Sequence, residues 1–161
     1  MIMKTCLFAG TFDPVNIGHF NIVKKLIDKY DKVVVAIGVN PDKTPLFSIE
    51  DRLLFLKTAF SFSSKIVVDS YSCLTVSYMQ TNKIDVLVRG VRNSVDLEFE
   101  KQNELKSKAI FPSLITEYIF VDDNQNVSSS LIREQIKNKQ DFSAFVPSSC
   151  HQLIKEKALK L

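Results

Sequence analysis

The chain has 161 residues, 45% of them hydrophobic and 24% charged, with a formal net charge of +3. This length suits one domain with its own hydrophobic core, so we expect a single unit over residues 1–161. The small positive excess does not favour a nucleic-acid surface, and no apolar run is long enough to cross a bilayer, so we expect neither nucleic acid nor membrane as a partner.

The first twenty residues carry the most informative pattern. Residues 4–9 predict a strand, residues 10–19 form a glycine-punctuated loop that ends in a histidine, and apolar residues at helical spacing follow. A strand that passes through such a loop into a helix builds an anion site, because free backbone N–H groups point at the bound phosphate. Alternatively, Gly10, Pro14 and Gly18 are ordinary turn residues.

Strands and helices alternate along the rest of the chain. We predict further strands at residues 33–37, 66–68, 85–88 and 118–121, and helices at residues 49–60 (capped by Ser48), 74–81, 94–108, 128–137 and 147–160. This order predicts an α/β fold: a single-domain, Rossmann-like, doubly wound sheet of five parallel strands with helices on both faces. Ligands bind such sheets at the carboxyl ends of the strands, near the point where strand order reverses.

Two arginines follow the fourth predicted strand. Arg89 and Arg92 flank Gly90, which is expected to allow a tight turn. Guanidinium groups bind phosphate through paired donors, so the two side chains are candidates for phosphate contacts. Solvated surface arginines are the alternative, but the position after a buried strand favours the site.

Two further segments offer anion contacts. Ser128, Ser129 and Ser130 open a predicted helix; capping explains one of these hydroxyls, and three in a row favour a second phosphate cradle. Lys43 lies in a loop that Pro41 and Pro45 restrict, and we expect it at the same edge of the sheet as the first motif. A solvated lysine is the alternative.

The cysteines do not point to catalysis. Cys6, Cys73 and Cys150 form no C-x-x-C pair, and no signal peptide precedes them, so a cytoplasmic protein with reduced, structural thiols is expected. No zinc-site spacing and no Ser-His-Asp series occur. With no covalent nucleophile in place, the chemistry is expected to rest on positioning and charge stabilisation.

Together these motifs resemble the bacterial phosphopantetheine adenylyltransferases, in the nucleotidyltransferase superfamily that carries a T/H-x-G-H box. The match covers nearly the whole chain: G-T-F-D-P-x-x-x-G-H (10–19), N-P-D-K-T-P-L-F (40–47), V-R-G-V-R (88–92), D-L-E-F-E (96–100) and V-S-S-S-L-I-R (127–133). The resemblance implies transfer of the adenylyl group of ATP to 4′-phosphopantetheine by direct in-line displacement, giving dephospho-coenzyme A and pyrophosphate in coenzyme A biosynthesis. A nicotinamide mononucleotide adenylyltransferase and a non-catalytic nucleotide-binding module are the alternatives.

The resemblance also implies residue roles. His19 would be catalytic, and phosphopantetheine would contact Thr11, Lys43, Thr75 and Arg89. ATP would contact Thr11, Phe12, His19, Gly90, Val91, Arg92, Glu100, Asn124, Gln125, Asn126, Val127, Ser128, Ser129 and Ser130. No protein metal ligand is expected, because Mg²⁺ would be bound mainly through ATP phosphates. A homohexamer, and coenzyme A as a feedback ligand, are implied as well.

The chain departs from the family pattern in the box itself. Where the usual sequence is T-N-G-H or similar, this chain has Asn16-Ile17-Gly18-His19. Asn16 keeps a hydrogen-bonding side chain, so we expect its role to survive, whereas Ile17 loses a polar group. The loop before Ser128 is also shorter than usual.

Overall fold

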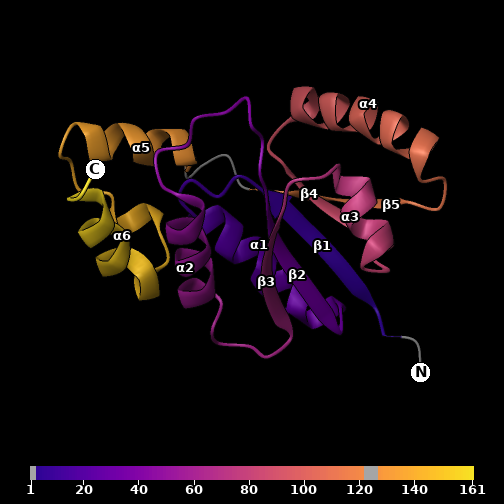
Figure 1. Ribbon diagram of the computed structural model, residues 1–161, viewed down its shortest axis with the longest axis horizontal. Coiled ribbons are helices and arrows are strands. Elements are labelled where there is room, and N and C mark those ends of the chain that lie inside the picture. The colour runs from indigo at the N-terminus through magenta and orange to yellow at the C-terminus, as the bar shows by residue number, and fades with distance from the viewer. Residues whose placement is uncertain (1–2, 122–126) are drawn as a thin grey trace.

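The computed structural model describes residues 3–121 and 127–161 as a parallel sheet with helices on both faces (Figure 1). The sheet has five strands in the order β3-β2-β1-β4-β5. The strands are β1 (Thr5–Gly10), β2 (Lys32–Gly38), β3 (Ile66–Tyr71), β4 (Val86–Val91) and β5 (Ile115–Phe120). The helices are α1 (Ile17–Lys29), α2 (Ile49–Ala59), α3 (Thr75–Thr81), α4 (Ser94–Ile110), α5 (Ser129–Lys137) and α6 (His151–Ala158).

The strand order reverses beside the central strand. β1 pairs with β2 on one side and with β4 on the other, and Leu7 lies between Val34 and Leu87 in the register. The chain winds outward from β1 to β3 and then returns to β4, so the loops after β1 and β4 diverge. This divergence opens a crevice at the carboxyl ends of the two strands. The predicted fold class is thereby confirmed.

Successive side chains of β1 are buried on alternating faces of the sheet. Cys6 and Phe8 belong to the larger core, beneath α1, α2, α5 and α6, while Leu7 and Ala9 belong to the smaller core beneath α3. All four are less than 8% exposed, which explains why this strand reads as a continuous apolar run. Figure 1 shows α5 and α6 together at one end of the molecule and α3 and α4 at the other.

Helix α4 is attached differently from the other long helices. It buries none of its residues, and Val95, Phe99 and Leu105 are all more than 60% exposed. These apolar side chains point away from the core on a helix that is otherwise largely polar. In the described residues, no helix has the length and apolar character that crossing a membrane requires.

Several boundaries differ from the sequence prediction. Arg89, Gly90 and Val91 lie inside β4 rather than after it, so the predicted tight turn at Gly90 is wrong. Glycine there gives the Ile22 side chain of α1 room to pack closely: an added Cβ would lie 2.9 Å from Cδ1 of Ile22, which would have to shift. β5 begins at Ile115, and the final helix predicted over residues 147–160 consists of a short 3₁₀ turn (Ser148–Cys150) followed by α6.

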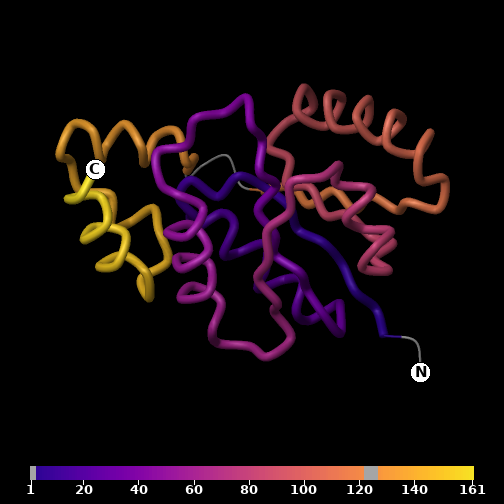
Figure 2. Tube along the Cα trace, viewed as in Figure 1, coloured from indigo at the N-terminus to yellow at the C-terminus, as the bar shows by residue number. Residues whose placement is uncertain are grey.

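Two buried charged side chains hold the loop between β1 and α1. Asp13, 3% exposed, accepts hydrogen bonds from the backbone N–H groups of Leu46 (2.7 Å) and Phe47 (2.9 Å). Arg52, 5% exposed, donates from Nη1 to the carbonyl of Thr11 (3.0 Å) and from Nε to that of Phe47 (3.1 Å). The loop after β1 is thus tied to the start of α2 in both hydrogen-bonding directions. The loop between β2 and α2 then passes close to α5, where residues from both line one cavity (Figure 2).

An Asp13→Asn substitution should lower the free energy of unfolding by about 1–3 kcal/mol, because an amide accepts on one side and leaves a buried backbone N–H unpaired. Urea denaturation at pH 7 measures the change. Asp42→Asn, at an exposed loop carboxylate, is the matched control and should unfold like the parent chain. Equal stability of the two variants would show that the hydrogen bonds accepted by Asp13 do not stabilise the fold.

Candidate active site

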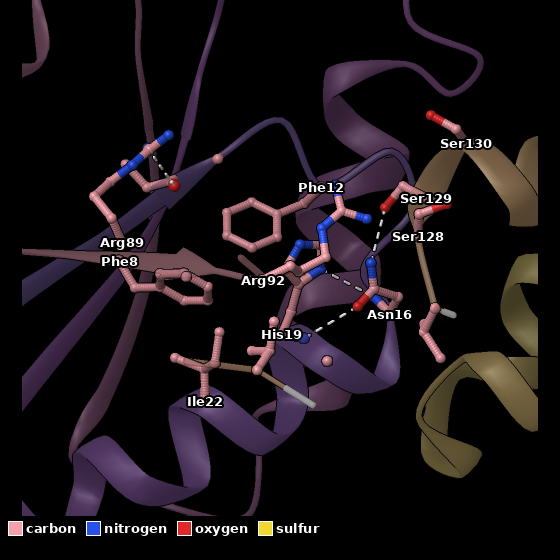
Figure 3. A pocket seen from close by; sticks show the side chains of 16 residues that line it. Phe8, Phe12, Asn16, His19, Ile22, Arg89, Arg92, Ser128, Ser129 and Ser130 are labelled. Carbon is pink, nitrogen blue, oxygen red and sulfur yellow. Dashed lines mark hydrogen bonds between the residues drawn. The ribbon is translucent and has the colours of Figure 1, made fainter. Parts of the chain in front are cut away.

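The N-termini of α1 and α5 meet above the crevice between β1 and β4, and they enclose a cavity of about 350 Å³ that we call the His19 cavity (Figure 3). Helix N-termini present free backbone N–H groups and partial positive charge, so their convergence suits an anion. The lining residues are Phe8, Ala9, Gly10, Phe12, Asn16, Gly18, His19, Ile22, Arg89, Gly90, Arg92, Val121, Val127, Ser128, Ser129 and Ser130.

Asn16 and His19 form a reciprocal cap at the start of α1. The Oδ1 atom of Asn16 accepts from the backbone N–H of His19 (3.1 Å), and Nδ1 of His19 accepts from the backbone N–H of Asn16 (3.1 Å). Two orphan donors of the helix end are therefore satisfied within one turn. Because a backbone N–H can only donate, Nδ1 of His19 must carry its lone pair, and the ring proton lies on Nε2.

Aromatic rings surround the imidazole of His19. The Phe12 ring lies at 4.7 Å between centroids and the Phe8 ring at 6.0 Å, both edge-on. Phe12 adopts a left-handed backbone conformation (φ 49°), which is costly for a residue with a side chain, and its ring is 2% exposed. Burial lowers the pKa of His19 from 6.5 to about 4. At neutral pH the side chain is therefore a neutral Nε2–H donor.

The start of α5 is built from its serines. Ser128 caps the helix by accepting from the backbone N–H of Leu131 (3.1 Å), so it is the one serine of the three that capping explains. The hydroxyl of Ser129 donates to the carbonyl of Pro14 (2.7 Å) and accepts from Nδ2 of Asn16 (3.1 Å). The first turn of α5 is thereby joined to the first turn of α1.

Two arginines from β4 and its end line the His19 cavity. Arg89 forms a bidentate ion pair with Glu100 of α4, with both N···O distances at 3.0 Å, and its Nη1 reaches the carbonyl of Ala9 (3.4 Å). Arg92 pairs more loosely with Asp96 (3.6 Å) and remains half-exposed. Arg89 is therefore held in place from α4, whereas Arg92 has more freedom to turn toward an anion.

Two more cavities adjoin the first. The Thr75 cavity, of about 180 Å³, shares Arg89 with the His19 cavity and includes Thr75, Glu100 and Asn103. The Lys43 cavity, of about 470 Å³, lies along the other side of the β1–α1 loop and includes Thr11, Lys43 and Arg133.

The residues expected from the sequence are distributed over these three cavities. The expected catalytic residue His19 lies in the cavity named after it, which also includes eight of the expected ATP contacts: Phe12, His19, Gly90, Arg92, Val127, Ser128, Ser129 and Ser130. Of the expected acceptor contacts, Thr11 and Lys43 line the Lys43 cavity, and Thr75 and Arg89 line the Thr75 cavity.

The other expected ATP contacts lie elsewhere. Glu100 faces the Thr75 cavity, where it pairs with Arg89, and Thr11 faces the Lys43 cavity. Val91 is fully buried, so any contact from it would have to come from the backbone. The expected contacts Asn124, Gln125 and Asn126 fall outside the described residues.

Sequence reasoning missed three residues that shape the site. Asp13 and Arg52 hold the loop that carries Thr11 and Phe12. Arg133 donates from Nη1 to the carbonyl of Asp13 (2.9 Å) and from Nη2 to Oγ of Ser130 (3.0 Å). Asp13 and Arg133 stand inside the quoted motifs and could have been considered, whereas Arg52 lies on an ordinary amphipathic helix and carries no such signal.

The site suits anions better than a resident metal ion. Within the described ranges 3–121 and 127–161, no three His, Cys, Asp or Glu side chains gather closely enough to hold one. Cys6 and Cys150 are buried, and burial raises the pKa of each thiol to about 12, so neither is a thiolate at neutral pH. Arginines, hydroxyls, backbone N–H groups and a neutral histidine remain as the functional groups.

Comparison with known proteins identifies relatives over nearly the full length. The family model described as cytidylyltransferase-like matches residues 7–135. The chain is 37% identical over 151 residues to the phosphopantetheine adenylyltransferase of Flavobacterium psychrophilum, covering 91% of this chain and 97% of that one. It is 34% identical to the phosphopantetheine adenylyltransferase of Petrotoga mobilis, covering 99% of both chains.

A solved structure shares the fold at much lower identity. It is a bifunctional NMN adenylyltransferase/ADP ribose pyrophosphatase from Francisella tularensis, complexed with AMP and a manganese ion. The TM-score is 0.71 at 17% identity, over 96% of this chain and 49% of that one, so this chain spans about half the length of the bifunctional protein. At this identity the likeness bears on the fold alone.

The low pKa of His19 makes stability depend on pH. Between pH 6.5 and about 4 the unfolded chain binds a proton at this residue and the native chain does not, so the free energy of unfolding should fall as the pH is lowered through this window. His19→Asn should remove that part of the fall. Urea denaturation at pH 7.0, 5.5 and 4.5 tests this, with His151→Asn as the control at the other histidine. Parallel curves for His19→Asn and the parent would contradict the burial of a neutral ring.

Proposed function

This chain belongs to the phosphopantetheine adenylyltransferase family, and we propose from this premise how its three cavities divide the reaction. The chain is an adenylyltransferase that transfers the adenylyl group of ATP to 4′-phosphopantetheine, giving dephospho-coenzyme A and pyrophosphate. The observation that carries the assignment of the cavities is the convergence of two helix N-termini and a neutral histidine at the β1/β4 crevice.

The His19 cavity would bind the triphosphate of ATP. Free N–H groups of α1 and α5, the hydroxyls of Ser128 and Ser130, and the guanidinium of Arg92 all border it. An N-terminal helix turn stabilises negative charge through fixed dipoles that need no reorganisation during the reaction. His19 would donate its Nε2–H to an oxygen on the α-phosphorus, where charge builds up as the bond to pyrophosphate breaks.

The acceptor would approach from the two neighbouring cavities. Lys43 and Arg89 border the Lys43 and Thr75 cavities and would neutralise the attacking phosphate between them. The rest of the molecule would follow the Thr75 cavity, whose polar residues include Asn103 and Thr116; Thr116 Oγ1 is buried without a hydrogen-bond partner among the described residues. An amide of the acceptor would satisfy it.

The reaction needs no covalent enzyme intermediate. An oxygen of the acceptor phosphate would attack the α-phosphorus of ATP, forming one P–O bond while the bond to pyrophosphate breaks. The chain's residues would hold the two phosphates in line and spread the developing charge over His19, Arg92 and the helix N-termini.

Mg²⁺ fits this site as a partner of ATP. Because the described residues offer no carboxylate cluster, the ion would be held by phosphate oxygens and water, and it would supply charge neutralisation at the triphosphate. Coenzyme A contains the same nucleotide and pantetheine parts as the product, so it would fit the same cavities as a feedback ligand. The three free thiols suit a reducing compartment, which favours the cytoplasm.

The exposed face of α4 supports assembly into a homohexamer. Val95 (76% exposed), Phe99 (62%) and Leu105 (72%) are exposed apolar side chains on a helix that buries none of its residues in the single chain. Phe120 of the edge strand β5 is 59% exposed as well. Apolar side chains at this density suit contacts between copies, with the polar residues of α4 forming the hydrogen-bonded rim.

The assignment is tested by incubating the chain with ATP, Mg²⁺ and one acceptor at a time while pyrophosphate release is followed. We expect fast release with 4′-phosphopantetheine and very slow release with pantetheine that lacks the phosphate or with nicotinamide mononucleotide. Comparable rates with and without the phosphate would refute the roles of Lys43 and Arg89. A preference for nicotinamide mononucleotide would establish the alternative activity.

Replacing His19 with alanine should lower kcat by about a hundredfold or more, because the lost donor acts mainly on the transition state. ATP binding should become weaker but remain measurable by calorimetry. His151→Ala removes the other histidine, on α6, and should leave kcat unchanged. Near-normal turnover of His19→Ala would show that His19 has only a structural role at the start of α1.

The assembly is tested by light scattering coupled to size exclusion at micromolar concentration. We expect a mass six times the 18.3 kDa of one chain, and smaller species when Phe99→Glu and Leu105→Glu place charge on the exposed surface of α4. Leu54→Glu, at an exposed leucine of α2, is the control and should keep the parent mass. A monomeric parent chain with full activity would show that function does not need the hexamer.

A further inference from the structure

Asn16 forms a long-range hydrogen bond that could not be predicted from its position in the first motif. Besides capping α1, it donates from Nδ2 to the hydroxyl of Ser129, 113 residues further along the chain (3.1 Å). That hydroxyl donates in turn to the carbonyl of Pro14 (2.7 Å). We infer that Asn16 and Ser129 act as a latch: they are positioning residues that hold His19 as a neutral Nε2–H donor aimed into the cavity.

The donor and the acceptor of each hydrogen bond in the latch can be assigned. The carbonyl of Pro14 can only accept, so the hydroxyl of Ser129 must donate to it, and its lone pair then accepts from the amide of Asn16. The amide nitrogen of Asn16 is thereby turned toward Ser129 and its oxygen toward the backbone N–H of His19. Since Oδ1 faces a donor and Nδ2 faces an acceptor, the Asn16 amide has one favoured orientation.

The orientation of the Asn16 side chain affects the imidazole of His19 through the backbone N–H of Asn16. With its side chain held at both ends, Asn16 keeps its own N–H aimed at Nδ1 of His19 (3.1 Å), and that bond leaves the ring proton on Nε2. Asn16 is 5% exposed, so water does not compete readily for these bonds. Gly18 leaves room for the arrangement, because an added Cβ there would lie 3.0 Å from Oδ1 of Asn16.

The latch assigns a different task to Ser129 from that of its neighbours. Its hydroxyl is engaged with Asn16 and Pro14, while its backbone N–H belongs to the first turn of α5, at the border of the His19 cavity. Ser129 would thus bind ATP through its backbone and position His19 through its side chain. It also sets the spacing between the two helix N-termini that border the cavity.

Two variants break the latch from opposite sides and keep the cap of α1. Asn16→Ser retains an acceptor for the N–H of His19, because serine caps helices as well as asparagine does, but it is too short to reach Ser129. Ser129→Ala leaves the Asn16 side chain in place and removes its partner. Ser61→Ala, which removes an exposed hydroxyl bonded to the carbonyl of Thr58 (3.2 Å), is the matched control.

The first readout is the tautomer of His19 in the ligand-free protein, measured by nitrogen-15 NMR of the imidazole at pH 7. The chain has two histidines, so His151→Gln assigns the signals. The parent and Ser61→Ala should show the Nε2–H tautomer alone, whereas Asn16→Ser and Ser129→Ala should show a mixture of both tautomers. Unchanged tautomers in both folded latch variants would overturn the inference.

The second readout is kinetic, and it rests on the proposed adenylyl transfer. Each latch variant should lower kcat by roughly tenfold to a hundredfold, as expected when a catalytic group is misplaced. The double variant should lose little more than either single one, because both remove the same contact. Effects that multiply would show that the Ser129 hydroxyl acts on ATP independently, and this would overturn the inference. A parent chain without adenylyl transfer would refute the proposed function, while the NMR readout would still decide the latch.

Discussion

Two buried charges, Asp13 and Arg52, fix the loop that leaves the central strand, and the geometry of the cavity depends on them. Asp13 accepts hydrogen bonds from two backbone N–H groups of the loop just before α2, and Arg52 of α2 donates one to the carbonyl of Thr11. Because an ion is costly to bury without partners, both side chains have little alternative to this geometry. The loop that they hold contains Phe12 in a left-handed conformation and ends at Asn16, the N-cap of α1. The imidazole of His19 is thus positioned by side chains that do not themselves line the His19 cavity.

The His19 cavity is suited to anions although few fully charged cationic side chains line it. Helix N-termini and a neutral imidazole line it, one arginine is neutralised by Glu100, and the other is half-exposed. Neutral donors oriented in advance stabilise charge as it develops, yet they bind a released anion less strongly than a cluster of cations would. Such a balance suits a reaction whose product, pyrophosphate, carries more charge than the group that is transferred.

The sequence predicted the fold class, and it predicted a candidate site at the carboxyl ends of the strands for a physical reason: the motif at residues 10–19 encodes local geometry. A glycine-punctuated loop before an amphipathic helix can be recognised without knowledge of the rest of the chain. The pairing of Arg89 with Glu100 and the bond from Asn16 to Ser129 could not be predicted, because each depends on which elements the sheet order brings together. Gly90 was misread for the same reason. Its missing side chain serves close packing against Ile22 of α1, a contact 68 positions away in the chain, which local turn rules cannot reveal.

The bidentate pair between Arg89 and Glu100 has a consequence for local unfolding. α4 contributes no buried side chain, so in a single chain its attachment to the sheet rests largely on polar contacts of this kind. Segments with few buried apolar contacts open at a small fraction of the global free energy and exchange their amide hydrogens early. An acceptor phosphate at Arg89 would draw on the same guanidinium that holds Glu100. Binding of the acceptor phosphate and local opening of α4 would then be linked equilibria. The bound phosphate would change the hydrogen-exchange rate of α4 backbone amides that it does not contact.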